Sequence, residues 1–204
     1  MLSLLFQSPL AFIIAFGGLI VAVSIHEAAH AFMADYLGDP TPRSQGRTTL
    51  DPRAHLDPVG TIMLLLFRFG WGKPVNFDPY NLKEPIRDTS LIALAGPASN
   101  LLMAALIGLS IKFLAMPALL TFALYQILVI SVVLAIFNLI PVHPLDGSKI
   151  ILSLLPKDTA YEYERFMHQY GMWVLILLIL PWGGTSPVSQ LIWPVIEFII
   201  NLLA

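Results

Sequence analysis

The chain has 204 residues, of which 57% are hydrophobic and only 12% carry a charge, and its mean hydropathy is +0.78. Soluble globular domains contain about 25% charged residues, so this composition excludes an ordinary soluble domain and is typical of a polytopic membrane protein. The formal net charge of −2 gives no indication of a nucleic-acid partner. Cysteine is absent. Disulfides and thiolate ligands are therefore excluded, and any bound metal must use His, Asp or Glu.

The first hydrophobic segment runs from about Pro9 to Tyr36 and is long enough for a membrane-spanning helix, which needs about 20 largely apolar residues. A polar connection over residues 38–57 follows it. Within this connection, Gly46–Leu50 predicts a small β element, whose edge is suited to strand addition by an extended peptide. The next apolar run, Val59–Phe69, has only about a dozen residues, too few to cross a membrane. We interpret it as a re-entrant or interfacial segment.

Two further segments, from Thr89 to about Met116 and from about Ala118 to Ile140, are also long enough to span a membrane. An amphipathic region then leads to two shorter apolar runs, Gly171–Trp182 and Pro187–Ala204, which prolines and glycines interrupt. We therefore predict an all-α polytopic membrane protein with about five membrane helices plus the re-entrant segment.

The basic residues test this layout. If Val59–Phe69 does not cross the membrane, all eleven Lys and Arg residues except Lys112 fall on one side. These residues are Arg43, Arg47, Arg53, Arg68, Lys73, Lys83, Arg87, Lys149, Lys157 and Arg165. A full crossing would scatter them, so the positive-inside rule favours the re-entrant interpretation and assigns this side to the cytoplasm. We expect an integral protein of a prokaryotic plasma membrane, with its N-terminus outside.

His26, Glu27 and His30 form an HExxH sequence inside the first hydrophobic segment. On an α-helix, positions i and i+4 lie on one face, so both imidazoles can bind one metal ion. Glu27 lies about 100° around the helix, beside the ligands. There it can serve as a general base toward water. The motif predicts a metal site on the cytoplasmic side with a catalytic glutamate.

The alternative is a structural helix whose histidines satisfy neighbouring polar groups, or a proton-relay cluster. Ionisable side chains in an apolar helix are unfavourable unless they are paired, and in membrane helices such residues are functional by default. One metal ion would offset this cost for all of them. The small neighbours Ala28, Ala29 and Ala31 leave room for another helix or a substrate.

A tetrahedral catalytic zinc needs a third protein ligand, and Asp146 in the sequence PVHPLDG is the best candidate. Pro141 and Pro144 cannot continue a helix, so the backbone unwinds there. Unwound backbone at membrane depth is tolerated only inside protein or beside water. Gly147 is expected to permit a sharp turn after the ligand. This stretch alone would favour an ordinary loop acid, but His30 and Asp146 both fall near the cytoplasmic ends of their predicted helices.

Three other polar residues have simpler interpretations. His143 lies three residues before Asp146 and is the alternative or additional third ligand. His55, in the polar connection, is interpreted as a loop or hydrogen-bonding histidine, with a role in gating as the alternative. Asn138 is expected to tie down the unwound end of its helix.

Further motifs accompany the HExxH sequence. The pattern NxxPxxxLDG occupies Asn138–Gly147, and Gly96–Asn100 reads GPxxN. Together with the HExxH in a membrane helix, these motifs resemble the site-2 protease family of intramembrane metalloproteases. His55–Thr61 and Gly70–Val75 are similar to the compact branch of that family that lacks a PDZ domain. The matches span residues 26–149. The HExxH lies in the first hydrophobic segment, and no PDZ-sized insertion is present.

The resemblance implies that His26, His30 and Asp146 bind one Zn²⁺ per chain, and that Glu27 is the general base that activates water at the zinc. It also implies that Asn100 helps to hold the substrate backbone or the developing oxyanion, since an amide N–H can stabilise such charge. The alternative for Asn100 is a hydrogen bond between helices.

The implied reaction is hydrolysis of peptide bonds in membrane-protein substrates, as in regulated intramembrane proteolysis. A membrane metal transporter or metal-binding protein is the alternative, and an inactive scaffold is a third. A transporter needs polar groups along a route across the whole membrane, whereas Lys112 is the one charged residue within 89–140. We expect a single integral membrane domain over residues 1–204, with its catalytic core at about 9–150 and C-terminal helices at about 166–204.

Overall fold

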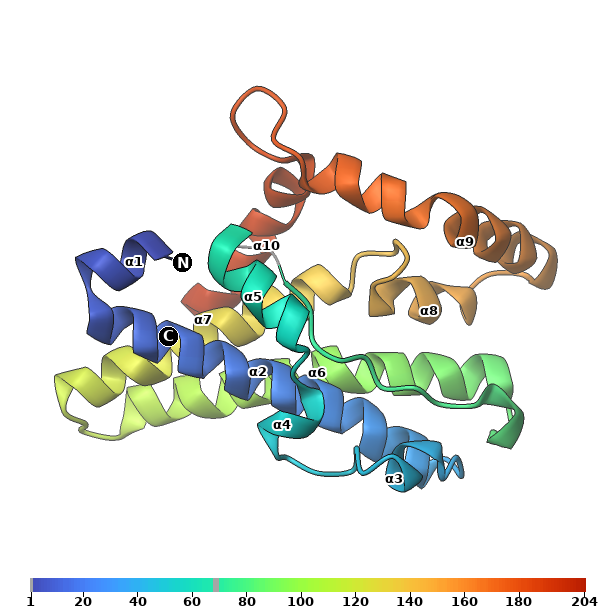
Figure 1. The fold of residues 1–204 in the computed structure, drawn as a ribbon, viewed down its shortest axis with the longest axis horizontal. Coiled ribbons are helices and arrows are strands. Elements are labelled where there is room, and N and C mark those ends of the chain that lie inside the picture. Colours follow the sequence, from blue (N-terminus) through green and yellow to red (C-terminus); the bar gives the residue numbers. More distant parts are fainter. Residues whose placement is uncertain (1, 68–69) are drawn as a thin grey trace.

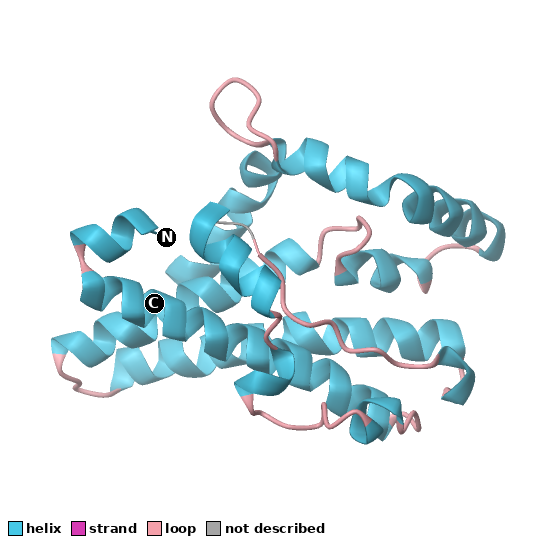
Figure 2. Ribbon diagram, viewed as in Figure 1, coloured by secondary structure: helices cyan, strands magenta, loops and turns pink. Residues whose placement is uncertain are grey.

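The computed structural model describes residues 2–67 and 70–204, and it consists of helices joined by turns and extended segments (Figure 2). Within these ranges no strand belongs to a sheet, and the only β pairing consists of isolated bridges between Leu56 and Gly72 and between Trp182 and Thr185. The helices are α1 (Leu2–Gln7), α2 (Pro9–Tyr36), α3 (Thr41–Ser44), α4 (Pro52–His55), α5 (Pro58–Phe67), the short 3-10 helix η1 (Pro79–Asn81), α6 (Pro85–Phe113), α7 (Ala118–Asn138), α8 (Asp146–Leu152), α9 (Lys157–Ile179) and α10 (Pro187–Leu203).

Three long helices, α2, α6 and α7, pack side by side and form the body of the protein (Figure 1). They have 28, 29 and 21 residues and are apolar enough to cross a membrane, so the three long apolar helices predicted from the sequence are confirmed. Their contacts use small residues, since Ala22, Ala31, Ala104 and Ala135 are fully buried. Small side chains let the helix backbones approach closely where lipid supplies no hydrophobic driving force.

Helix α5 corresponds to the short apolar run. It has 10 residues, which at about 1.5 Å per residue gives about half of the 30 Å hydrocarbon thickness. The helix is therefore too short to cross, as the sequence indicates, and its re-entrant placement stays a prediction. The end of the predicted run, including Arg68 from the charge count, lies outside the described residues.

The prediction of a small β element at Gly46–Leu50 is wrong. Gly46 adopts a positive φ of 67°, and the N–H of Arg47 donates to the carbonyl of Pro42 at 2.8 Å. The chain turns again two residues later, where the N–H of Thr49 donates to the carbonyl of Arg47. Local turns therefore take up the backbone groups that a strand would have presented to a partner.

An extended segment over residues 70–78, which we call the 70–78 segment, follows α5 and runs alongside the second half of α2 (Figure 1). Its far end is fixed by Asp39, a fully buried acid just after α2. The carboxylate of Asp39 accepts hydrogen bonds from the N–H of Asp78 at 2.7 Å and from Nδ2 of Asn81 at 2.8 Å. It also accepts two hydrogen bonds from Thr41. The segment is thus tied to the end of the helix that carries the HExxH motif.

The C-terminal region contains two helices. The amphipathic region and the first short apolar run form one continuous 23-residue helix, α9, and the second run forms α10 with 17 residues. A turn with positive φ at Gly183 and Gly184 separates them. Among the described residues, three helices are long and apolar enough to span a membrane, so the predicted total of about five membrane helices stays a prediction.

Candidate metal centre

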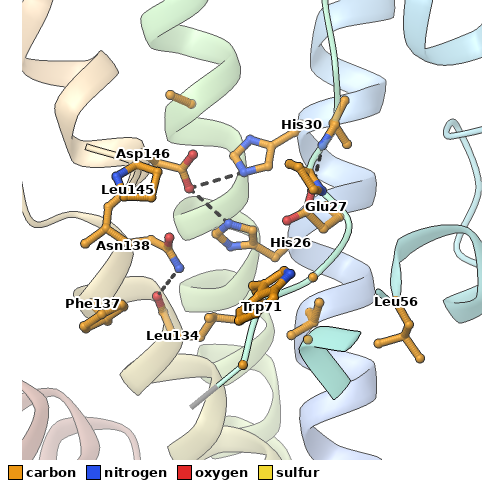
Figure 3. A pocket seen from close by; sticks show the side chains of 18 of the residues that line it. His26, Glu27, His30, Leu56, Trp71, Leu134, Phe137, Asn138, Leu145 and Asp146 are labelled. Carbon is orange, nitrogen blue, oxygen red and sulfur yellow. Dashed lines mark hydrogen bonds and ion pairs between the residues drawn. The ribbon is translucent and has the colours of Figure 1, made fainter. Parts of the chain in front are cut away.

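The two histidines of the HExxH motif lie one turn apart in the second half of α2 (Figure 3). His26 is 4% exposed and His30 is 7% exposed. Their rings meet edge to face, with centroids 4.6 Å apart. The i, i+4 spacing therefore produces the shared face that the sequence predicts.

Asp146 lies close to the two histidines, although it is 120 residues from His26 in the sequence. Helix α7 ends at Asn138, a turn-rich loop follows, and Asp146 is the first residue of α8. Its Oδ2 atom lies 3.0 Å from Nε2 of His26 and 3.3 Å from Nε2 of His30 (Figure 3). Each of the three side chains can offer one ligand atom, and these atoms lie within 4.8 Å of one another. The structure thus brings together the three residues predicted as metal ligands.

Helix α6 packs against the two histidines through its GPxxN sequence. A Cβ at Gly96 would lie 2.4 Å from Nε2 of His30 and 2.7 Å from Cε1 of His26, so glycine is required for this approach. Pro97 lies within α6 and has no N–H to donate to the preceding turn, which loosens the helix there. In that turn the carbonyl of Ile92 lies 2.7 Å from Nδ1 of His30. A carbonyl oxygen can only accept, so Nδ1 carries a hydrogen, and in a neutral His30 this leaves Nε2 available to bind a metal.

Gly147 has a different role from the predicted sharp turn. It lies inside α8 rather than in a turn after the ligand. A Cβ there would lie 2.3 Å from the carbonyl oxygen of Leu139 and 2.4 Å from that of Ile140. Glycine thus lets the first turn of α8 pack against the end of α7. Helix α9 holds the same loop, since the Tyr163 hydroxyl donates to the carbonyl of Pro141 at 2.9 Å.

Asn100, predicted to contact substrate, is fully buried behind His26. Its Nδ2 atom lies 3.4 Å from Nδ1 of His26, and its Oδ1 atom has no partner among the described residues. Rotating the amide by 180° exchanges these atoms without a change of shape, and Oδ1 would then accept the hydrogen of Nδ1. This arrangement leaves Nε2 of His26 free for a metal. The geometry supports a role in orienting His26, and the predicted contact with substrate stays a prediction.

Glu27 lies beside the histidines and against the 70–78 segment (Figure 3). Its Oε2 atom accepts a hydrogen bond from the N–H of Val75 at 3.2 Å and lies 3.9 Å from the guanidinium of Arg47. Arg47 is 3% exposed, and it also donates to the carbonyls of Lys73 and Pro74. The sequence argument treated Arg47 only as a cytoplasmic charge, because the turns that bury it carry no sequence signal of their own.

A cavity of about 440 Å³ opens onto these residues. Its polar wall contains His26, Glu27, His30 and Asp146. The remaining wall is largely apolar, and it includes Phe16, Leu19, Ile20 and Val23 of α2, Trp71 and Val75 of the 70–78 segment, and Leu134 and Phe137 of α7. Such a pocket, apolar with a few convergent polar groups, is typical of a site that binds an organic ligand or a peptide segment.

The donor set fits a zinc ion. Two neutral imidazole nitrogens and one carboxylate oxygen are ordinary ligands of catalytic zinc. Such ligands lie about 2.0–2.2 Å from the metal, so their atoms must approach one another as closely as those of His26, His30 and Asp146 do here. The other ring nitrogen of His30, Nδ1, is hydrogen-bonded to the backbone carbonyl of Ile92. A backbone carbonyl is a common outer partner of a metal-binding histidine.

The other singled-out residues lie outside this group. His143 packs near His168, with ring centroids 6.3 Å apart, and among the described residues it does not join the potential metal ligands. His55 is fully buried, and its Nε2 atom lies 2.7 Å from the carbonyl of Thr49, as expected for a hydrogen-bonding histidine. Asn138 donates to the carbonyl of Leu134 at 2.9 Å (Figure 3), which stabilises the last turn of α7 as expected.

Comparisons with known proteins agree with this chemistry. A sequence model of peptidase family M50 matches residues 114–180. YwhC of Bacillus subtilis, which bears the name of a zinc metalloprotease, is 37% identical over 190 residues, covering 88% of this chain and 84% of YwhC. Two mycobacterial proteins named Rip2, with the same description, are 28% identical (Mycobacterium tuberculosis) and 30% identical (Mycolicibacterium smegmatis), each covering 83% of this chain and 68% of its own length. No solved structure matches the chain.

Proposed function

This chain belongs to peptidase family M50, the site-2 protease family of zinc metalloproteases, and we propose that it is an endopeptidase that hydrolyses peptide bonds of membrane proteins within the bilayer. The observation that carries this proposal is the convergence of Glu27, His26, His30 and Asp146 on one cavity among helices of spanning length. The three proposed ligands come from α2 and α8, and Glu27 of α2 lines the cavity beside them.

His26, His30 and Asp146 would hold the zinc ion. When bound, zinc supplies a Lewis acid that polarises the scissile carbonyl and makes water easier to deprotonate. Glu27 acts as the general base, taking a proton from the attacking water and delivering it to the leaving amine. Its carboxylate lines the cavity and is held there by the N–H of Val75, which supports this assignment.

The shape of the cavity supports a substrate that arrives from the lipid. Its apolar wall follows α2 from His26 back to Phe16, ten residues and thus about 15 Å along the helix axis. A peptide bond inside a substrate helix is hidden by its own hydrogen bonds, so the substrate must unwind to be cleaved. The backbone of the 70–78 segment and the amide of Asn100 are the candidates for holding the unwound chain and the developing oxyanion.

The topology belongs to the same proposal. The bias of basic residues supports a cytoplasmic placement of the metal centre and an outside N-terminus, in the plasma membrane of a prokaryote. We retain one integral membrane domain over 1–204, with a catalytic core at about 9–150, and C-terminal helices that complete about five membrane helices. Helix α5 fits a re-entrant position because it is short and because Leu56 before it and Gly70 after it both line the cavity.

The test is Glu27→Gln, which keeps the size of the side chain but removes the base. Wild type and variant are reconstituted in lipid vesicles with a single-span model substrate, and cleavage and zinc content are measured. We expect cleavage to fall by at least about 100-fold while one zinc per chain is retained. If the variant cleaves the substrate at the rate of the wild type, Glu27 is not the general base. Zinc flux across the vesicle membrane without any cleavage would support the transporter instead.

A further inference from the structure

Lys149 is the one Lys or Arg among the described residues that line the cavity. It lies in α8, three positions after Asp146, and side chains three residues apart lie on one face of a helix. Its ammonium nitrogen is 5.2 Å from the centre of the Phe77 ring, which belongs to the 70–78 segment. A cation over an aromatic ring is an attractive contact, so the half-buried lysine is held beside the cavity.

No acidic side chain pairs with this lysine. Among the described residues Lys149 takes part in no ion pair. The two acids of the cavity have other partners, since Asp146 faces the two histidines and Glu27 faces Arg47 and the N–H of Val75. An ammonium group has three hydrogens to donate. Lys149 therefore presents an uncompensated positive charge to whatever fills the cavity.

Lys149 lies at the end of the cavity that is near the C-terminal end of α2. Its partner Phe77 packs against a buried cluster that includes Ala34, two residues before the end of α2. The apolar wall extends in the opposite direction as far as Phe16, eighteen residues from Ala34 and thus about 27 Å along the helix. The cavity therefore has an apolar end, suited to the embedded part of a membrane segment, and a cationic end where such a segment leaves the membrane.

We propose that Lys149 is a specificity-determining residue that binds an aspartate or glutamate side chain of the substrate, close to the scissile bond. This inference rests on the proposed peptidase function and names a substrate feature that the site selects. Side chains three residues apart on a helix start about 5–6 Å from each other, and an extended peptide advances about 3.3 Å per residue. Allowing for the reach of the lysine chain, the acid lies about two to four residues from the bond at the metal centre.

The charge of Lys149 selects this occupant. A backbone carbonyl or a neutral side chain could accept a hydrogen bond from the ammonium group, but it would leave the charge uncompensated in a largely apolar cavity. Membrane helices ordinarily carry Lys or Arg at their cytoplasmic end, and Lys149 would repel such a residue in the cavity. The same lysine thus favours segments with an acid at this position and disfavours ordinary basic ones. A lipid phosphate is the competing anion.

Binding is measured apart from cleavage to test this role. The zinc-loaded full chain carrying Glu27→Gln is reconstituted in phosphatidylcholine nanodiscs and titrated with fluorescent single-span peptides that contain a helix-breaking Gly-Pro pair. Each peptide carries one Asp at a successive position around this pair, and its control carries Asn there. We expect one position at which the Asp peptide binds about tenfold more tightly than the Asn peptide, the scale of one charge-assisted hydrogen bond. Equal binding of the Asp and Asn peptides at every position would overturn the proposal.

Variants of Lys149 separate recognition of the acid from packing against Phe77. Lys149→Met keeps a long unbranched side chain without the charge and should abolish the preference for Asp, whereas Lys149→Glu should reverse it in favour of a peptide with Lys at that position. Lys83→Met, at an exposed lysine outside the cavity, is the matched control and should keep the preference. A preference for Asp that survives in Lys149→Met, with all peptides weakened equally, would show a packing role only and overturn the proposal.

Two further measurements separate this role from lipid binding and from the peptidase itself. If phosphatidylglycerol added to the nanodiscs abolishes the preference for Asp in the chain that retains Lys149, the lysine binds the lipid phosphate and the proposal is wrong. A chain with Glu27 intact that binds Asp peptides preferentially but cleaves none of them would refute the peptidase and keep the binding site. Cleavage of the Asp, Asn and Lys peptides with equal kcat/KM would keep the peptidase and refute the role of Lys149.

Discussion

The Nε2 atom of His26 lies 3.0 Å from Oδ2 of Asp146, although 120 residues separate the two in the chain. The same oxygen lies 3.3 Å from Nε2 of His30, so one carboxylate oxygen faces both imidazoles. Helix α2 supplies the histidines and the start of α8 supplies the carboxylate. The metal centre therefore forms only when the C-terminal half of the chain folds back onto the first spanning helix.

Replacing Asp146 by Asn keeps the shape of the side chain but removes the negative charge of the proposed third ligand. We expect zinc affinity to fall by at least about 100-fold, since even outer partners of metal ligands contribute 10–100-fold, and cleavage to fall with it. The exposed acid at the start of α9 provides the control, Asp158→Asn. Zinc content after dialysis against a chelator distinguishes the two. An Asp146→Asn protein that retains wild-type zinc would remove this residue from the ligand set.

Gly96→Ala tests the close approach of α6 to the histidines. The added Cβ would lie 2.4 Å from Nε2 of His30, the atom that we propose binds the zinc ion. We expect lost or strongly weakened zinc binding in a protein that still contains its helices. Gly17→Ala is the matched control, because a Cβ there has no atom within 4 Å among the described residues, and alanine favours the helix slightly. Zinc titration and circular dichroism of both variants provide the measurement.

Local patterns in the sequence were enough to locate the long helices and to single out His26, His30 and Asp146, which the structure brings together. Apolar stretches set the three spanning helices, and the i, i+4 spacing of His26 and His30 set a common face. What depends on tertiary packing was not predictable. Gly147 is required by two carbonyls of the preceding helix end rather than by a turn. The strand expected at Gly46–Leu50 is replaced by turns, since a five-residue polar stretch leaves open where its backbone hydrogen bonds go.

Asn100 offers a prediction that separates its two candidate roles. If it orients His26, Asn100→Ala should lower zinc affinity about 10–100-fold, the usual effect of losing the outer partner of a metal-binding histidine. If it acts only on the substrate or oxyanion, zinc affinity should be unchanged while kcat falls by about 100-fold. Zinc titration and steady-state cleavage on the same preparations decide between the roles. The 3.4 Å approach of its amide to Nδ1 of His26 leads us to expect the first result.

The stability supplied by Asp39 should depend on pH. Burial alone would raise the pKa of Asp39, but its hydrogen bonds from Thr41, Asn81 and Asp78 outweigh burial and hold the pKa below its ordinary value of 3.8. A carboxyl with a depressed folded-state pKa stabilises the fold above its unfolded pKa, and this stability is lost as the pH falls through the folded value. We expect Asp39→Asn to melt below the wild type at pH 7, with a gap that narrows below about pH 4. A gap independent of pH down to pH 3 would contradict this assignment.

Arg47→Lys tests whether the 70–78 segment must be held beside Glu27 for cleavage. The guanidinium donates to the carbonyls of Lys73 and Pro74 and lies 3.9 Å from Glu27, a set of directions that a lysine ammonium cannot reproduce. We expect kcat/KM to fall about tenfold, as for the loss of one charge-assisted hydrogen bond, with zinc content unchanged because Arg47 contacts Glu27 and the 70–78 segment rather than the proposed ligands. Arg53→Lys, at a side chain that is 90% exposed, should cleave like the wild type. Equal activity of the two variants would show that the segment holds its position without Arg47, and loss of zinc in Arg47→Lys would show that the segment supports the metal centre rather than the base.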